Sequence, residues 1–475
     1  MRLGVLRHPL GDGFDARRAF EVLHPAGDAF WLDSGPGGRA FLGSGRWVAL
    51  PPGGVLPALR AELAALRVDE PLGGVPLGLV GWLGYELRGE TTGAEVRRRG
   101  PHPDAAFLRV DRLVVVEPDG SAALLALGTG WHGELAEWRD RTAAQLVEER
   151  GDRTPTQLIE ERRRAASPRL ETSVTPFTPV ASRHAASRRS SATSGAAPTW
   201  HDTPERYLAN IDACREAIRE GDAYQLCLTT EVRVEGAFDP LAVFDAVRAS
   251  GATHHGGLVR IGDTTLVSAS PERFLEVTPD GVVRTSPIKG TRPRHPDAAS
   301  DAALAAELVA SEKERAENLM IVDLMRNDLS RVCETGSVAV TRLLEVESYS
   351  QVHQLVSSIE GRLRADAGVV DAIAACFPAG SMTGAPKLRA IELLDALEAR
   401  PRGPYAGAFG YLAADGSADL AMTIRTIVFD AAGASVGTGG GITSGSDPEA
   451  ELAEARLKSA APLAALTSTS LRQTL

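Results

Sequence analysis

The side chain of Lys289, in the segment SPIKGTRPR, offers the plainest chemistry in the sequence. An amine in a short loop of apolar residues and glycine is poorly solvated, and burial lowers the pKa of a lysine from its usual value of about 10.4. A neutral amine is a nucleophile. The alternative is a surface lysine in a turn, followed by the basic residues Arg292, Arg294 and His295. The loop alone favours the surface lysine, and only the motifs elsewhere in the sequence favour the nucleophile.

Two pairs of glutamates have helical spacing. Glu314 and Glu317 are three residues apart in ASEKERAENLM, and Glu451 and Glu454 are three apart in DPEAELAEARLK, which ends at Lys458. Each pair therefore shares one face of its helix. Either face alone is typical of a solvated surface. If the two faces met, their oxygens could hold Mg²⁺ and leave coordination positions for a carboxylate of the substrate.

Two glycine-containing loops precede predicted helices. In SVGTGGGITSGSDPE, Gly439 and Gly440 stand ahead of the second acidic helix, where backbone N–H groups can approach an anion. In FPAGSMTGAPK, Ser381 adds a hydroxyl donor. Both loops are also consistent with plain connections between elements. Neither has the GxGxxG pattern of a dinucleotide site.

Three further residues are unremarkable when each is taken alone. His353, in SQVHQLVSS, is predicted in a strand, where a lone histidine is more often structural than catalytic. Tyr405 lies in RGPYAGAFGY and Arg425 in DLAMTIRTIV. A buried arginine requires a carboxylate partner, which could belong to a ligand.

Composition excludes several classes of protein. The chain has 475 residues, 43% of them hydrophobic, so it can bury a large core. A formal net charge of −11 argues against binding to nucleic acid or to an anionic membrane. The four cysteines form no CxxC pair, which argues against a zinc site or a disulfide framework. Because no apolar run resembles a signal peptide or a membrane span, we expect a cytoplasmic protein.

Residues 152–199 are rich in Arg, Ser, Ala and Pro and are predicted to form a flexible linker. This segment separates an N-terminal region, 1–151, from a C-terminal region, 200–475. The N-terminal region is predicted to hold short strands and then a helix over about 133–150.

In the C-terminal region, Thr203 and Pro204 are typical of the start of a helix, which Gly221 would end. The pattern predicts one long helix over 302–333 and strands on either side of the Lys289 loop. Segments 403–416, 419–433 and 435–446 are predicted to form a single antiparallel meander before a helix that begins at Pro448.

The motifs SPERFL, PIKGTRPR, AENLMIVDLMRNDL, HQLVS, FPAGSMTGAPK, YAGAFGY, MTIRT and GTGGGITSGSDPEAELAEARLK occur in this order. The sequence resembles the chorismate-utilising enzymes, which include anthranilate, aminodeoxychorismate, isochorismate and salicylate synthases. The resemblance extends over about 201–465 and continues more weakly in WLDSG and GLVGWLGYEL. It implies the α/β (α+β) fold of anthranilate synthase component I, in which antiparallel sheets form a sandwich with helices outside.

The resemblance also implies roles for individual residues. Glu317 and Glu454 would hold Mg²⁺, with Glu451 and the catalytic Glu314 supporting them directly or through water. Lys289 would be the nucleophile and His353 would lie near the reacting ring. The implied chorismate-binding residues are Gln225, Thr291, Ser381, Tyr405, Arg425, Gly439, Gly440 and Lys458.

Two positions imply which reaction is catalysed. Members of the family that use water carry a lysine base where this chain has Gln225, and a neutral amide cannot deprotonate water. Anthranilate synthases usually carry PIAGT, whereas aminodeoxychorismate synthases usually carry PIKGT, the pattern around Lys289. That lysine would attack ring carbon 2 and expel the 4-hydroxyl, after which ammonia would add at carbon 4. The implied product is 4-amino-4-deoxychorismate, on the route to 4-aminobenzoate.

The segment ATHHGGLVRIG replaces the Asn-Pro-x-Pro-aromatic segment of many aminating relatives, so the resemblance implies no tryptophan site. None of the four cysteines lies in a GxCxG context, so we expect ammonia from a separate glutamine amidotransferase subunit. Two alternatives stay open. One is an aminating enzyme with a 2-amino product, such as anthranilate, and the other is a non-catalytic homologue that only docks the amidotransferase.

Overall fold

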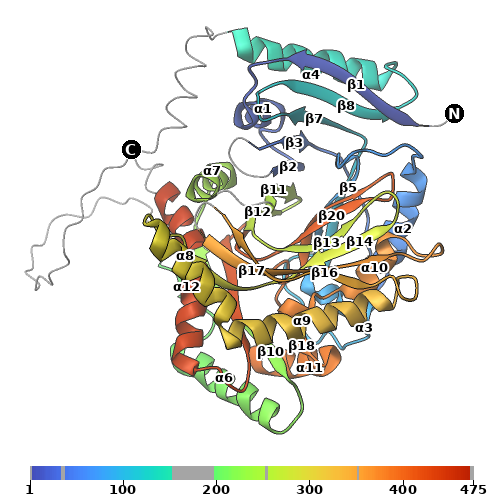
Figure 1. Cartoon of the computed structure of the whole chain (residues 1–475). Coiled ribbons are helices and arrows are strands. Elements are labelled where there is room, and N and C mark those ends of the chain that lie inside the picture. The colour runs from blue at the N-terminus through green and yellow to red at the C-terminus, as the bar shows by residue number, and fades with distance from the viewer. Residues whose placement is uncertain (1–2, 34–37, 152–196, 252–254, 350–351, 471–475) are drawn as a thin grey trace, which may run out of the picture.

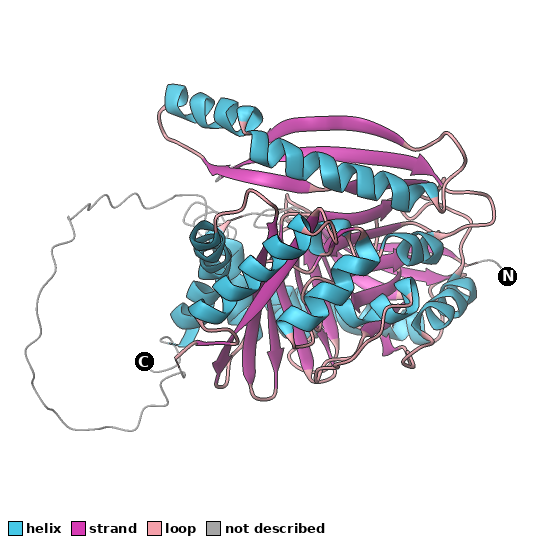
Figure 2. Ribbon diagram, turned by 90° about the horizontal axis from the view of Figure 1, so that it is seen from below, coloured by secondary structure: helices cyan, strands magenta, loops and turns pink. Residues whose placement is uncertain are grey.

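Two antiparallel sheets form the centre of the protein (Figure 1). The structure is a computed structural model that describes residues 3–33, 38–151, 197–251, 255–349 and 352–470. The sheets pack as a sandwich, and Figure 2 shows the helices lying outside the strands. The predicted fold class is confirmed. Nearly all of the predicted linker, 152–199, lies outside the described residues.

The larger sheet has twelve strands among the described residues, in the order β1-β8-β7-β3-β2-β11-β12-β21-β22-β10-β18, with β9 also paired to β10. Its strands are β1 (Gly4–Gly11), β2 (Ala29–Asp33), β3 (Ala40–Gly43), β7 (Arg112–Val116), β8 (Ala122–Gly128), β9 (Thr199–Trp200), β10 (Gln225–Glu235), β11 (His255–Ile261), β12 (Thr264–Ser270), β18 (Gly384–Ala385), β21 (Thr426–Asp430) and β22 (Gly433–Ile442).

The smaller sheet has ten strands in the described part of the chain, in the order β15-β17-β14-β13-β20-β19-β5-β6-β4, with β16 also paired to β17. Its strands are β4 (Arg46–Trp47), β5 (Gly78–Leu83), β6 (Ala105–Val110), β13 (Arg273–Val277), β14 (Val282–Ser286), β15 (Ile288–Pro293), β16 (Ala339–Ser348), β17 (Val352–Arg362), β19 (Ala408–Ala413) and β20 (Ala418–Met422).

Strands from both predicted regions of the chain join within each sheet. In the larger sheet β2 pairs with β11, and in the smaller sheet β5 pairs with β19. Figure 1 shows these blue N-terminal strands beside strands from much later in the sequence. The N-terminal segment therefore helps to form the two sheets on which the rest of the molecule is built.

The main hydrophobic core lies between the sheets. Trp82 and Phe107 come from the N-terminal strands and Phe274 and Phe409 from the C-terminal ones, and all four are at most 2% exposed. Burial of a side chain of this size stabilises the folded state by roughly 1.5–3 kcal/mol. The core thus links the two parts of the sequence energetically.

The helices cover the outer faces of the sandwich. On the larger sheet α12 packs on β22, α7 on β12 and α11 on β10, while α9 packs on β17 of the smaller sheet.

No helix among the described residues is long and apolar enough to cross a membrane. The helices are α1 (Ala16–Leu23), α2 (Val55–Leu66), α3 (Arg88–Thr92), α4 (Glu134–Gly151), α6 (Pro204–Arg219), α7 (Pro240–Ser250), α8 (Ala298–Ala310), α9 (Glu312–Ser330), α10 (Val369–Cys376), α11 (Lys387–Glu398) and α12 (Pro448–Ser470), with 3₁₀ turns η1 (Tyr85–Leu87) and η2 (Gly380–Met382).

The single helix predicted over 302–333 is wrong, because two helices, α8 and α9, replace it. The break falls at Ser311, whose backbone is extended and whose hydroxyl accepts a hydrogen bond from the backbone N–H of Glu314. A serine at this position competes with helix continuation because it satisfies a free N–H of the next helix. The break lets α9 run in its own direction. Glu314 and Glu317 both lie on this helix.

The predicted single meander over 403–446 is also wrong. β19 and β20 pair in the smaller sheet, whereas β21 and β22 pair in the larger one. The chain crosses between the sheets over Thr423–Arg425, and Arg425 adopts a left-handed backbone with φ 51°. This conformation is uncommon for a residue other than glycine. It marks a sharp change of chain direction at a candidate site residue.

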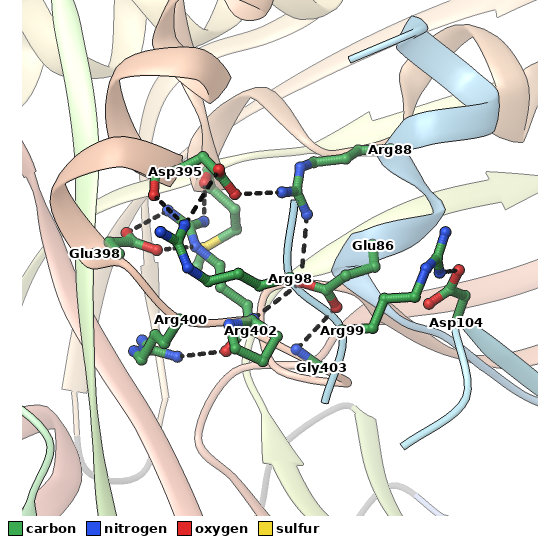
Figure 3. A network of polar contacts seen from close by, with 12 residues as sticks. Glu86, Arg88, Arg98, Arg99, Asp104, Asp395, Glu398, Arg400, Arg402 and Gly403 are labelled. Atoms are coloured by element: carbon green, nitrogen blue, oxygen red, sulfur yellow. Dashed lines mark hydrogen bonds and ion pairs between the residues drawn. The ribbon is translucent and has the colours of Figure 1, made fainter. Parts of the chain in front are cut away.

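A buried network of charges ties the N-terminal segment to the C-terminal one (Figure 3). The Glu86 carboxylate accepts hydrogen bonds from the backbone N–H groups of Arg402 and Gly403, both at 2.9 Å. Arg88 pairs with Glu86 at 3.3 Å and with Asp395 at 2.6 Å. Because these groups are almost fully buried, each charge depends on its partner.

Arg402 is the centre of this network. Its guanidinium pairs with Glu398 at 2.6 Å and donates hydrogen bonds to the backbone carbonyls of Met382 at 2.7 Å and Cys227 at 2.9 Å. The ring of Tyr85 lies 4.2 Å from the guanidinium carbon. Through these bonds one side chain fixes the loop that carries Ser381 and the strand that carries Gln225.

We predict that Arg402→Leu destabilises the fold by about 3–5 kcal/mol, because it leaves the buried Glu398 without its cation. The free energy of unfolding, measured by urea denaturation, checks this. Arg97→Leu is the control, because Arg97 and its partner Glu95 are largely exposed and their pair should contribute nothing measurable. Equal stabilities of the two variants would contradict the prediction.

Candidate active site

The glycine run of β22 forms the floor of a site. A Cβ atom on Gly441 would lie 2.4 Å from Nε2 of Gln225 and 3.4 Å from Nζ of Lys289. A Cβ on Gly440 would lie 3.0 Å from Oε2 of Glu451 and 3.9 Å from Nζ of Lys458. Side chains from β10, β15 and α12 therefore converge on one short stretch of backbone. A side chain at Gly441 would displace Gln225, and one at Gly440 would press on Glu451.

Lys289 points into this site from β15. Its side chain is 13% exposed, and Nζ lies 3.8 Å from Oε2 of Glu317. Burial lowers the pKa of Lys289, but the carboxylate of Glu317, supported by Cys227 and Glu272, opposes this effect, and the net shift is upward. The surface-lysine alternative is therefore excluded. The expectation that burial leaves this amine neutral is wrong for the arrangement seen here, because the carboxylates favour its charged form.

Arg292, three residues after Lys289, pairs with carboxylates of the neighbouring helices. Arg292 forms an ion pair with Glu307 at 2.5 Å, and its Nη1 lies 3.6 Å from Glu314. Its guanidinium thus neutralises two carboxylates of α8 and α9. Glu314 in turn lies against Gly290, where a Cβ would be 3.0 Å from its Oε2. Glu314 is therefore beside the Lys289 loop, as a supporting role requires.

Gln225 carries an unsatisfied amide. The residue is 1% exposed, and neither the nitrogen nor the oxygen of its side chain has a hydrogen-bond partner in the part of the chain that the structure describes. Leaving a buried polar group unpaired costs about 1–3 kcal/mol. Such a group facing Lys289 across Gly441 is suited to bind a small polar molecule.

The two acidic helices do meet. Nζ of Lys313, on α9, lies 3.1 Å from Oε1 of Glu451 on α12 and 4.0 Å from Oε1 of Glu317. Oε1 of Glu451 also accepts a hydrogen bond from Ser446 at 2.7 Å. Burial raises the pKa of Glu317, although Lys289 and Lys313 oppose the rise. One ammonium group therefore lies between carboxylates of both helices.

Glu454 and Lys458 form the outer part of the acidic face. Their side chains pair at 2.7 Å, and Nζ of Lys458 also donates a hydrogen bond to the carbonyl of Gly439 at 2.9 Å. Burial raises the pKa of Glu454, but Lys458 outweighs it and the net shift is downward. Lys458 therefore lies against the backbone of β22, on the side from which α12 approaches.

The residues present fit a hard divalent cation. Carboxylate oxygens are the preferred ligands of Mg²⁺, and here a lysine ammonium already stands between Glu317 and Glu451 where a cation is favoured. No three acidic, histidine or cysteine side chains in the described ranges are arranged as a complete metal-binding group. A metal site at this acidic face therefore stays a prediction.

The structure adds Glu272, from the motif SPERFL, to the candidate residues. Burial raises its pKa to about 7, against the opposing effects of a hydrogen bond with Ser381 and the charges of Lys289 and Lys458. A carboxyl group with this pKa can both give and accept a proton near neutral pH. The sequence analysis missed this role because the burial of Glu272, between β12 and β13, depends on the packing of both sheets.

Three further candidates lie around the same floor. Ser381 contacts Glu272, as described, and the ring of Tyr405 covers Gly437, where a Cβ would lie 2.1 Å from it. Burial raises the pKa of Tyr405, so its hydroxyl stays protonated. Burial lowers the pKa of Arg425, although Tyr405 and Glu454 oppose this shift. An arginine stays protonated in proteins despite such a shift. Arg425 therefore carries a charge that a substrate carboxylate could pair with.

Two predicted site residues, His353 and Thr291, have contacts with residues other than Lys289 and Glu317. Both ring nitrogens of His353 are engaged, with Ser348 at 2.7 Å and Asp301 at 3.0 Å. Thr291 is exposed in β15, opposite Gln354 of β17. These contacts do not involve Lys289 or Glu317, so the roles predicted for His353 and Thr291 stay predictions.

Comparison with known proteins identifies relatives of this chain. Residues 52–464 match the family described as chorismate binding enzyme. An aminodeoxychorismate synthase of Streptomyces pristinaespiralis is 41% identical over 420 residues, which cover 87% of this chain and 54% of that protein. Anthranilate synthase component 1 of Arthrobacter globiformis is 37% identical over 443 residues, covering 89% of this chain and 79% of that one.

The chain covers between 43% and 65% of the length of four similar aminodeoxychorismate synthases. Its fold is also that of a solved structure, anthranilate synthase component I from Streptococcus pneumoniae TIGR4. That structure is 26% identical and has a TM-score of 0.68, with 97% of this chain and 92% of that chain covered. With a family match over most of its length and relatives well above 30% identity, the chain belongs to the chorismate binding enzymes.

Proposed function

We propose that this protein is the ammonia-using component of an aminodeoxychorismate synthase, which converts chorismate and ammonia to 4-amino-4-deoxychorismate. The observation that carries the proposal is that the side chains of Lys289 and Gln225 both lie against Gly441. The lysine is the nucleophile that 4-amination requires, and the neutral amide is unsuited to activate water. Similar proteins named aminodeoxychorismate synthase support the same choice.

In the proposed reaction the amine of Lys289 forms a bond to ring carbon 2. The ring double bonds shift, and the carbon–oxygen bond at carbon 4 breaks, so that the hydroxyl leaves as water. Ammonia then forms a bond to carbon 4, the double bonds shift back, and the bond to Lys289 breaks. Gln225 faces Lys289 and is placed to hold ammonia through its unpaired amide atoms.

Glu272 supplies the proton transfers that these steps need. Lys289 must lose a proton before it attacks, because carboxylates hold its pKa above the usual value. Glu272 is one of those carboxylates and can accept the proton. It can then return a proton to the departing hydroxyl, so that one group serves as base and as acid.

Residues on both sides of the floor would bind the carboxylates of chorismate. Lys458, Arg425 and Tyr405 present cationic or donor groups, and the backbone of Gly439 and Gly440 lies beside Lys458. Glu317 and Glu454, supported by Glu314 and Glu451, would hold Mg²⁺. When bound, this ion would supply positive charge to a substrate carboxylate.

Ammonia would come from a glutamine amidotransferase that is separate from these 475 residues. We place the product on the route to 4-aminobenzoate, which serves folate or a specialised metabolite. The cytoplasmic location that the composition indicates stays a prediction.

Amination at carbon 2, which would give anthranilate, is the second candidate, because relatives named anthranilate synthase match a similar share of the chain, 89% and 96%. A docking protein without catalysis is disfavoured by the buried charges of Lys289, Glu317 and Glu451. Burying charged groups costs free energy, and docking alone gives no reason to retain them.

The purified protein with chorismate, Mg²⁺ and a high concentration of ammonium at alkaline pH should form 4-amino-4-deoxychorismate. Glutamine should support turnover only after an amidotransferase is added. Mass spectrometry and NMR identify the product. Anthranilate as the product would favour the second candidate, and efficient use of glutamine by the chain alone would contradict the proposed partner.

Lys289→Ala should lower the rate of 4-amination by several orders of magnitude, because it removes the proposed covalent intermediate. Lys289→Arg should fail equally, since a guanidinium stays protonated. The wild-type protein incubated with chorismate and Mg²⁺ but no ammonia should carry a chorismate-derived adduct on the peptide that contains Lys289. Circular dichroism of both variants checks that they are folded, and an unchanged rate in the Ala variant would remove Lys289 from the mechanism.

The raised pKa of Glu272 predicts that the stability of the folded protein depends on pH. Its pKa is about 7 in the folded protein against a usual 4.5, so between these pH values the unfolded chain loses a proton that the folded protein keeps. The folded state should therefore weaken as the pH rises from 4.5 to 7, by on the order of 3 kcal/mol. Urea denaturation at pH 5 and pH 8 should show that Glu272→Gln lacks this loss. The same pH dependence in both proteins would contradict the assignment.

A further inference from the structure

Lys313 is a charged residue to which the proposed reaction gives no role. It is the second residue of α9, and its ammonium reaches across to α12, 3.1 Å from Glu451 and 4.0 Å from Glu317. These two residues are only 3% and 7% exposed. Two buried carboxylates on neighbouring helices repel each other unless a cation lies between them. Lys313 supplies that cation.

Three lysines neutralise the acidic face, and they differ in how firmly they are held. The side chain of Lys289 is 13% exposed and belongs to the floor of the site. Lys458 is 32% exposed and is also held by the carbonyl of Gly439. Lys313 is 45% exposed. A long, half-exposed side chain can move its ammonium into water at little cost, whereas a buried one cannot.

We propose that Lys313 is a resident counter-cation, which joins the acidic residues of α9 and α12 in the metal-free protein and is displaced when a divalent cation binds there. The inference rests on the metal site of the proposed function. An ammonium and a divalent cation cannot share the same carboxylate oxygens without strong repulsion. Binding of the metal is therefore a competition, and Lys313 sets its strength.

This arrangement has two consequences. Without metal, Lys313 keeps α9 and α12 together and preserves the alignment of Glu317 with Glu451. With metal, part of the binding free energy is used to release the ammonium, so the affinity is weaker than the carboxylates alone would give. Lys313 is thus a positioning residue, since it acts on the site through the glutamates.

The test uses Mn²⁺ as the probe, without chorismate, so that binding is measured apart from catalysis. The variant is Lys313→Met, which keeps the aliphatic stem and removes the ammonium. Free Mn²⁺ is followed by electron paramagnetic resonance during titration of the full chain. The dissociation constant should fall by roughly three- to tenfold, because no cation has to be displaced.

Thermal unfolding in EDTA gives the second readout. Lys313→Met should unfold at a lower temperature than the wild type, and saturating Mg²⁺ should remove most of the difference. Arg315→Met is the matched control, because it removes one positive charge from the same helix at an exposed residue that donates a hydrogen bond to the carbonyl of Val309. It should change neither quantity appreciably.

Glu317→Gln separates this inference from the proposed function, because it should abolish Mn²⁺ binding whether or not Lys313 is present. If Lys313→Met behaves like Arg315→Met in both measurements, the counter-cation role is wrong even where the metal site is real. If the wild type binds no Mn²⁺, the metal assignment fails and the displacement of Lys313 fails with it. Tighter Mn²⁺ binding together with lower metal-free stability would establish the inference.

Discussion

The close approach of side chains to the glycine run of β22 is the constraint on which the site depends. Gln225 and Lys289 converge on Gly441, while Glu451 and Lys458 converge on Gly440. Any Cβ there would occupy the space that these groups use. The strand also pairs along its whole length with β10, which carries Gln225. A single backbone segment thus fixes both the floor of the site and the position of one wall.

The second constraint is that buried charges must be neutralised. The cations that do this differ between the surroundings of Arg402 and those of Glu317 and Glu451. Around Arg402 every bond is made by buried groups, so the network is rigid and fixes backbone carbonyls of two site segments. Around Glu317 and Glu451 the cations are lysine side chains, one of them half exposed. Lysine is a flexible point charge, whereas arginine forms fixed multiple hydrogen bonds. The rigid network supports the site, and the flexible pairs leave it open to ligands.

Local signals in the sequence were sufficient for several elements. Thr203 and Pro204 correctly place the start of α6, and Asp447 and Pro448 that of α12. The helical spacing of Glu314 with Glu317 and of Glu451 with Glu454 correctly predicts shared faces. Spacing could not reveal that Lys313 lies between them, because that contact joins residues 138 positions apart in the sequence.

The helix break at Ser311 is a local feature, but the other errors came from long-range packing. The crossing from β20 to β21 depends on which sheet each strand joins, and nothing in the local pattern around Arg425 encodes that choice. The expectation of a neutral amine at Lys289 was wrong because it considered burial alone. The carboxylate of Glu317, which lies on α9, raises the pKa of that amine. Glu272 was missed for a similar reason, since its raised pKa follows from burial by residues distant in sequence.

The unpaired amide of Gln225 is the least favourable feature of the site and also the most informative. A fold dominated by stability would satisfy both amide atoms or replace the residue by an apolar one, because unpaired buried groups are rare in native proteins. Departures of this kind are expected where function requires them. The amide can donate and accept, and ammonia has both N–H donors and a lone pair. A molecule with that combination, held beside Lys289, would satisfy the amide and bring a nitrogen nucleophile to the same face of the glycine floor.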